Sequence, residues 1–168
     1  VGITVDALGN VYVTGYCFVD SINADYATIK YYPNGEIAWL SRYNGPEDNY
    51  DVAIAIAVDD SSNIYVAGYS FSDSTYQDFV TVKYDSSGKQ LWCSRYDGPE
   101  HSPDFCRALL VDDLGNIYVT GASFSFSPAD YDYTTIKYYP NGDTAWVRTY
   151  NGPGNGHDKT CVVAADDS

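Results

Sequence analysis

The chain repeats one pattern of residues three times. The pattern reads "SRYNGPEDNYD" at residues 41–51, "SRYDGPEHSPD" at 94–104 and "RTYNGPGNGHD" at 148–158. Sliding the chain against itself gives a period of 53 residues, which lengthens to 54 where one loop gains a residue. Three residue types recur at equivalent places: Tyr12, Tyr65 and Tyr118; Lys30, Lys83 and Lys137; Trp39, Trp92 and Trp146. Self-similarity at such a period is typical of a repeat architecture and constrains the fold more than any single motif.

Each period contains four short segments with the composition of β-strands. In the second copy they span residues 52–58, 63–70, 78–84 and 90–96, each rich in Val, Ile, Tyr or Thr. Turn sequences separate them: "DDSSN" follows the first segment and "DSSGK" follows the third. None of the segments has a helical period. The sequence therefore predicts one four-stranded antiparallel meander in each repeat.

A lone meander cannot cover both of its faces, so the copies must stack against one another and share a core. Four-stranded repeats of this length are typical of β-propeller blades. We therefore predict an all-β propeller fold over residues 1–168, with repeats at 1–51, 52–104 and 105–158 and the start of a fourth at 159–168. This gives three blades plus one extra strand. The recurrent tryptophan is expected to fill the gap between neighbouring blades.

Three blades fall short of the roughly four or more that a closed ring requires. Two arrangements would close it: the chain is part of a larger propeller, or several copies associate. The first is favoured, because a chain that ends within a hairpin leaves an unpaired strand edge.

Two stretches carry a resemblance to a known family. "DYATIKYYPNGEIAW" (25–39) and "DYTTIKYYPNGDTAW" (132–146) resemble the SBBP-type β-propeller repeats of bacteria and archaea. The second copy departs mildly, with Phe79 in the place of Tyr26 and "DSSGK" in the place of "YPNGE". The resemblance covers the whole chain and implies a seven-bladed fold. It also implies a secreted or cell-surface location and a scaffold or binding role, with no activity tied to a repeat residue.

The composition excludes several classes of partner. A formal net charge of −14 argues against nucleic acid and anionic membrane surfaces. No run of about eighteen apolar residues is present, so membrane insertion is not expected. The 45% hydrophobic content is enough for a globular core. The four cysteines do not repeat between copies and are expected to be buried apolar fillers, with a Cys106–Cys161 bridge as the alternative.

A propeller places its short hairpins on one face and its longer connections on the other. The second face would carry the connections between second and third strands together with the inter-blade segments, and binding residues favour such variable loops. The candidates for contact with a ligand on this face are the aromatic and imidazole side chains of Tyr50, Tyr76, His101, Phe126, Tyr131 and His157.

The same face is rich in carboxylates. Calcium is bound by six to eight oxygen ligands, often from flexible loops. The calcium candidates are Asp20, Asp25, Asp48, Asp73, Asp78, Asp130 and Asp132. No DxDxDG loop is present, and Asp51, Asp104 and Asp158 recur where a turn or a cap on the inner strand would suffice. The turn interpretation is favoured, and bound Ca²⁺ stays open as the alternative. No other cofactor is expected.

No catalytic motif is found. Serine-nucleophile, phosphate-loop and dinucleotide-binding patterns are missing, and His101 and His157 occupy non-equivalent positions. We therefore expect a non-catalytic, extracellular or cell-surface module that presents its loop face to a protein or a glycan. Two alternatives remain. One is a structural subunit of an extracellular assembly that pairs with further copies of its own repeats. The other is a lyase or hydrolase that acts on a polysaccharide through one of the histidines.

Overall fold

A computed structural model describes residues 1–21, 23–126, 129–158 and 162–164, and these residues form β-strands, turns and loops without a helix. The strands of the first repeat are β1 (Gly2–Val5), β2 (Val11–Phe18), β3 (Ala24–Tyr31) and β4 (Ile37–Tyr43). Those of the second are β5 (Asp51–Val58), β6 (Ile64–Ser72), β7 (Tyr76–Tyr84) and β8 (Gln90–Tyr96). Those of the third are β9 (Asp104–Val111), β10 (Ile117–Phe126), β11 (Ala129–Tyr138) and β12 (Thr144–Tyr150).

The strands form three four-stranded antiparallel sheets, each made of four consecutive strands in sequence order. We call them blade 1 (β1–β4), blade 2 (β5–β8) and blade 3 (β9–β12). The predicted all-β fold of propeller-like blades is confirmed. In blade 2 the strands β6 and β7 run two residues further than predicted, because Phe71 pairs with Gln77 and Ser72 pairs with Tyr76. The extra strand predicted at 159–168 lies mostly outside the described residues, and residues 162–164 are not in a strand.

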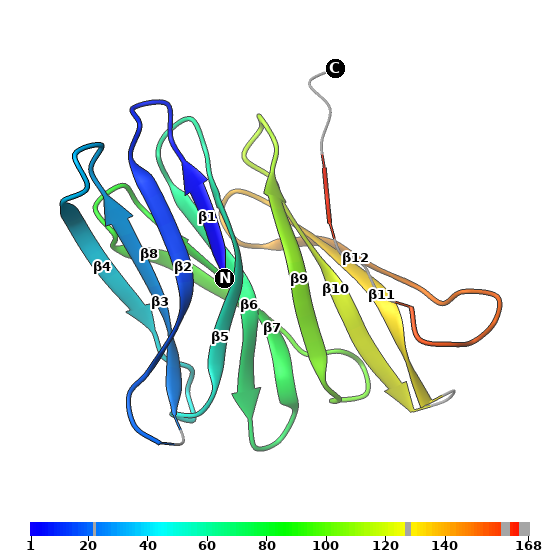
Figure 1. The fold of residues 1–168 in the computed structure, drawn as a ribbon. Coiled ribbons are helices and arrows are strands. Elements are labelled where there is room, and N and C mark those ends of the chain that lie inside the picture. Colours follow the sequence, from blue (N-terminus) through cyan, green and yellow to red (C-terminus); the bar gives the residue numbers. More distant parts are fainter. Residues whose placement is uncertain (22, 127–128, 159–161, 165–168) are drawn as a thin grey trace.

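The blades pack side by side around their inner strands. β1 contacts β5 and β5 contacts β9, and Figure 1 shows these three strands next to one another. One hydrophobic cluster joins blade 1 to blade 2, where the rings of Tyr12 and Tyr26 meet Val66 and Val82. A second cluster joins blade 2 to blade 3 in the same way, with Tyr65 at the place of Tyr12. Each blade therefore shares its core with its neighbour, as the repeat predicts.

The recurrent tryptophan fills the space between blades. The indole N–H of Trp39 in blade 1 donates to the carbonyl oxygen of Ser86 in blade 2 at 3.1 Å, and Trp92 makes the same bond to Pro140 in blade 3. A Cβ on Gly88 would lie 2.7 Å from the indole Cδ2 of Trp39, so the turn beneath the ring must be a glycine. That glycine has a φ of +85°, which also favours glycine. The predicted wedge role is confirmed.

The two ends of the blades differ in their connections. At one end, which we call the turn end, lie the tight hairpins. In the first of them Asp6 accepts hydrogen bonds from the backbone N–H groups of Leu8 and Asn10 and from the hydroxyl of Tyr12. Asp59 and Asp112 repeat this pattern, which explains why "D…N" recurs. At the opposite end, the loop end, lie the connections between second and third strands and the inter-blade segments 44–50, 97–103 and 151–157 (Figure 1).

The cysteines do not all behave as predicted. Cys106 is a free thiol buried between blades 2 and 3, which fits the filler role. Cys17 is half-buried and Cys93 is exposed. The prediction is wrong for Cys93, because it lies on the outer strand β8, where one side of the strand is open to solvent. Cys161 lies outside the described residues. Within those residues there is also no helix that could cross a membrane.

Candidate functional site

Each inter-blade segment at the loop end is closed by one recurring hydrogen bond. A glycine N–H donates to an aspartate Oδ2 at 2.5, 2.7 and 2.5 Å in the pairs Gly45–Asp51, Gly98–Asp104 and Gly152–Asp158. A Cβ on Gly45 would lie 2.5 Å from the Oγ of Ser70, so no larger residue fits without movement. The repeated "GP…D" motif therefore closes a loop through this hydrogen bond. This turn role is the one that the sequence predicts for these aspartates.

A second carboxylate from the third strand of the blade lies beside each of these aspartates. Burial and then the charge of Asp25 raise the pKa of Asp51. Burial raises the pKa of Asp104 to about 7, and the charges of Asp78 and Asp97 add to the shift. Three of the predicted calcium candidates, Asp25, Asp78 and Asp132, occupy this position. The third strand of one blade and the first strand of the next blade thus bring a pair of acids together at each blade junction.

The junction of blades 2 and 3 holds a third carboxylate, from Asp97. One carboxylate oxygen each from Asp78, Asp97 and Asp104 lie within 4.8 Å of one another, and this is the one such group of metal-ligating side chains in the described residues. Asp78 and Asp104 are 1% and 0% exposed. Sequence reasoning missed Asp97. The signal was present, because the other two copies carry Asn44 and Asn151 at the equivalent position.

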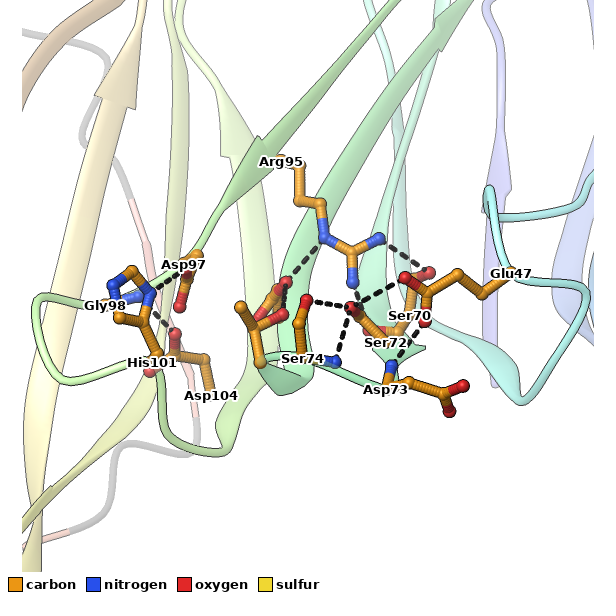
Figure 2. A network of polar contacts seen from close by, with 12 residues as sticks. Glu47, Ser70, Ser72, Asp73, Ser74, Arg95, Asp97, Gly98, His101 and Asp104 are labelled. Atoms are coloured by element: carbon orange, nitrogen blue, oxygen red, sulfur yellow. Dashed lines mark hydrogen bonds and ion pairs between the residues drawn. The ribbon is translucent and has the colours of Figure 1, made fainter.

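Hydrogen bonds hold one oxygen of each carboxylate in this cluster. Asp78 Oδ2 accepts from the hydroxyl of Thr75 at 2.7 Å and from the Nε of Arg95 at 2.5 Å. Asp97 Oδ2 lies 2.5 Å from the Nδ1 of His101, and Figure 2 shows this pair beside Asp104. Burial raises the pKa of Asp78 even though the Arg95 charge opposes the shift. These bonds fix the cluster in place, and they set three acids against the cationic side chains of Arg95 and His101.

The other predicted carboxylates do not join this cluster. Asp48 is exposed and accepts from the amides of Asn44 and Asn23, which lower its pKa. Asp73 is exposed, and its backbone N–H donates to the carboxylate of Glu47 (Figure 2). Asp20 is exposed on the connection after β2. Of the remaining candidates, Asp130 is buried in blade 3 and pairs with His157, and burial and then the charge of Asp130 raise the pKa of Asp132.

The loop end of blade 3 gathers aromatic rings. Tyr131 lies at the centre, with ring centroids 5.0 Å from Phe124, 5.9 Å from Phe105 and 5.6 Å from the imidazole of His157. Phe126 stacks edge-on against Phe124 at 5.2 Å. Three of the predicted binding-face residues, Phe126, Tyr131 and His157, are therefore brought together in one cluster.

The remaining predicted contact residues lie elsewhere. Tyr50 packs against Phe18 in blade 1, with ring centroids 6.2 Å apart. Tyr76 is exposed at the start of β7 with a φ of 63°. His101 lies in the segment between blades 2 and 3 (Figure 2). The loop end thus carries separate features on separate blades.

A recess opens beside the aromatic cluster of blade 3. It has a volume of about 160 Å³ and is lined by Phe105, Arg107, Ala122 and Tyr131. Arg107 is exposed, and among the described residues its guanidinium has no hydrogen-bond or ion-pair partner. Sequence reasoning missed Phe105 and Arg107. The sequence signal is that Phe105 and Arg107 differ from their counterparts on the inner strand of the second copy, which are the aliphatic Val52 and Ile54.

The two histidines do not share a site. His101 pairs with Asp97 in the segment between blades 2 and 3, whereas His157, in the segment after β12, pairs with Asp130 of β11. Both imidazoles are largely exposed, at 70% and 60% of their side-chain surface. Each histidine therefore has its own local carboxylate, and the two lie in different inter-blade segments.

Comparisons with family models and with solved structures each found a similarity. A structure of a fucose lectin from Kordia zhangzhouensis in complex with methyl-fucoside is similar over 89% of this chain and 97% of the lectin chain, with 12% sequence identity and a TM-score of 0.48. None of the curated proteins compared with the chain matches it. The family model of the SBBP β-propeller repeat matches residues 39–74, from the wedge tryptophan of blade 1 to the turn after β6. The chain thus consists of three blade-like sheets, and its segment 39–74 is similar to an SBBP β-propeller repeat.

Proposed function

We propose that this chain is a non-catalytic propeller module that binds a glycan at the loop end of blade 3. The observation that supports this most directly is the recess of about 160 Å³, where Phe105, Tyr131 and Arg107 line one volume. An aromatic ring offers a flat apolar surface to the C–H face of a sugar. A few polar groups beside it can then fix the orientation of the hydroxyls.

The chemistry of the recess favours a sugar over a larger apolar ligand. The Arg107 guanidinium supplies five N–H donors in a fixed geometry, and donors of this kind suit hydroxyl or carboxylate oxygens. The volume is below the roughly 300–1,000 Å³ of pockets that enclose drug-sized ligands. It therefore suits a single ring at the end or on the side of a glycan. His157, next to Tyr131, adds a polar group at the rim.

Two alternatives have less support. A polysaccharide-acting enzyme needs an acid and a base that converge on one substrate, and His101 and His157 pair with separate carboxylates in separate segments. A structural subunit would associate through further copies of its repeats, and light scattering on the isolated chain tests this by its dependence on protein concentration. The extracellular or cell-surface location stays a prediction that is supported by the family resemblance.

Glycan-array screening of the intact chain, followed by calorimetry with the strongest glycan, tests the proposal. Tyr131→Ala and Arg107→Ala should each weaken binding at least about tenfold, because each removes one of the two kinds of contact. The control is Tyr139→Ala, which removes an exposed tyrosine at the turn end of the same blade, away from the recess. The proposal fails if no glycan binds at millimolar concentration, or if both recess variants bind as tightly as the control.

A further inference from the structure

The cluster of Asp78, Asp97 and Asp104 buries negative charge that the protein only partly neutralises. Three carboxylates meet between blades 2 and 3, and in the part of the chain that the structure describes Arg95 is the one cation bonded to them apart from the exposed His101. Bringing carboxylates out of water without pairing costs several kcal/mol for each ion. A junction built in this way is incomplete without a further positive charge.

Each of the three carboxylates also leaves one oxygen unused. The Oδ1 atoms of Asp78, Asp97 and Asp104 are buried, and among the described residues none accepts a hydrogen bond of good geometry. The Ser123 hydroxyl lies close enough to Asp104 to lower the pKa of that carboxyl in part, but it too makes no hydrogen bond of good geometry. The Oδ2 atoms are held by Arg95 and Thr75, by His101 and by the N–H of Gly98 respectively. Buried polar atoms are nearly always partnered in native proteins. Three unpartnered oxygens in one place therefore point to a ligand that binds oxygen.

The spacing of the oxygens is compatible with a bound calcium ion. Ca²⁺ binds oxygen at 2.3–2.6 Å, so two oxygens on one ion are at most about 5 Å apart. One carboxylate oxygen from each residue of this cluster lies within 4.8 Å of the others, which is inside that span. Mg²⁺ demands near-ideal octahedral geometry at 2.0–2.1 Å and keeps several of its waters, so a site built from protein carboxylates suits Ca²⁺ better. The ligands are all carboxylate oxygens, which hard cations prefer over the softer metals.

We propose that Asp78, Asp97 and Asp104 form a calcium-binding site that joins blade 2 to blade 3. Their side chains come from β7, from the segment after β8 and from the start of β9. An ion held by all three would link the two blades across the loop end. Backbone carbonyls and water would complete the six to eight ligands that Ca²⁺ takes. The site is separate from the glycan recess and does not depend on it.

The other junctions supply a natural comparison. Asn44 stands at the position of Asp97 in the junction of blades 1 and 2, and Asn151 stands there after blade 3. The loop folds alike in all three copies, because the residue four positions later has a positive φ each time, at Asp48, His101 and Asn155. Asp97→Asn therefore introduces the residue that the same loop already accepts twice.

Calorimetric titration of the metal-free intact chain with CaCl₂ alone, at about 150 mM salt to screen surface charges, tests the proposal. We expect one saturable binding event and a rise in the melting temperature. Asp97→Asn should weaken the affinity for Ca²⁺ at least about tenfold, since it removes one of three carboxylate ligands. Its far-UV circular dichroism should match that of the parent. MgCl₂ in place of CaCl₂ should give a weaker response.

Asp73→Asn is the matched control, because Asp73 is an exposed acid at the same end of blade 2 and contributes only its backbone to the network. It should bind Ca²⁺ like the parent. Asp97→Ser is the second variant if Asp97→Asn does not fold. The proposal is overturned if the parent shows neither heat nor a melting shift at millimolar Ca²⁺. It is also overturned if the Asp97 variants and the Asp73 control respond alike, since the ion would then bind to the acidic surface in general.

Discussion

The two blade junctions have the same frame and a different distribution of charge. Both are closed by a glycine N–H bonded to an aspartate, and both are filled by a tryptophan bonded to the next blade. In the first junction the corresponding loop pair is Asn44 and Asp48. The amide of Asn44 donates to Asp48, so the carboxylate of this pair belongs to an exposed residue. In the second, the acid of the pair is Asp97, which faces the cluster. A repeat fold can thus keep its packing constant and change its chemistry by exchanging two residues of one loop.

The largest expected effect is on stability, and it tests whether the two blade junctions are packed equivalently. Trp39→Ala and Trp92→Ala should each lower the free energy of unfolding by about 3 kcal/mol, because each leaves a cavity between blades and removes one hydrogen bond. Urea unfolding monitored by circular dichroism measures both. Similar losses would show that the junctions are held alike, whereas a loss confined to one variant would contradict the common frame.

The glycines of the two loop closures should differ. A Cβ on Gly45 would lie 2.5 Å from the Oγ of Ser70, while a Cβ on Gly98 would come no closer than 3.1 Å to Asp104. Gly45→Ala should therefore destabilise the chain by about 1–3 kcal/mol through overpacking, and Gly98→Ala should cost less. Urea unfolding of the two variants gives the order. Equal losses would mean that Ser70 turns aside and that the two closures are equally tolerant.

The sequence predicted the frame better than the chemistry, for a physical reason. Positions such as Trp39 and Asp51 recur because every blade needs them, so their packing roles follow from the period alone. Asp97, Phe105 and Arg107 matter because they differ from their counterparts, and a search for what repeats does not select them. Asp78 and Asp97 meet within blade 2, because the pairing of Phe79 with Tyr96 brings them to the same end of β7 and β8. Asp104 joins them from β9 of the next blade, and that contact depends on how two blades pack, which no spacing along the chain specifies.

Moving the charge of the second junction into the first would sharpen the comparison. The double variant Asn44→Asp with Asp48→His reproduces the Asp97–His101 pair beside Asp25 and Asp51. If the third carboxylate decides calcium binding, calorimetry should show a second bound Ca²⁺ with an affinity within about tenfold of the first. Asp48→His alone is the control and should leave one bound ion. A double variant that binds no second ion would show that the junctions differ in more than this pair.

The smallest effect concerns protons at the first junction, where two acids meet without a third. Burial, followed by the charge of Asp25, raises the pKa of Asp51 above its usual 3.8, and the charge of Arg95 opposes the shift only in part. A raised carboxyl pKa means that the folded state favours the protonated form. The contribution of Asp51 to the free energy of unfolding is therefore fully present below about pH 4. It is lost as the pH rises through the raised pKa, by at most about 1.4 kcal/mol per pH unit.

Asp51→Asn should reduce that decline, because the asparagine oxygen can still accept the N–H of Gly45 but carries no charge. Melting temperatures between pH 4 and pH 8, without divalent cations, measure the difference. Asp48→Asn provides the control, since hydrogen bonds from Asn44 and Asn23 lower the pKa of the exposed Asp48 and its loss should leave the decline in this range intact. If Asp51→Asn melts with the same pH dependence as the parent, the charge of Arg95 already offsets the effect of burial on the pKa of Asp51. The contrast between the junctions would then lie in calcium binding alone.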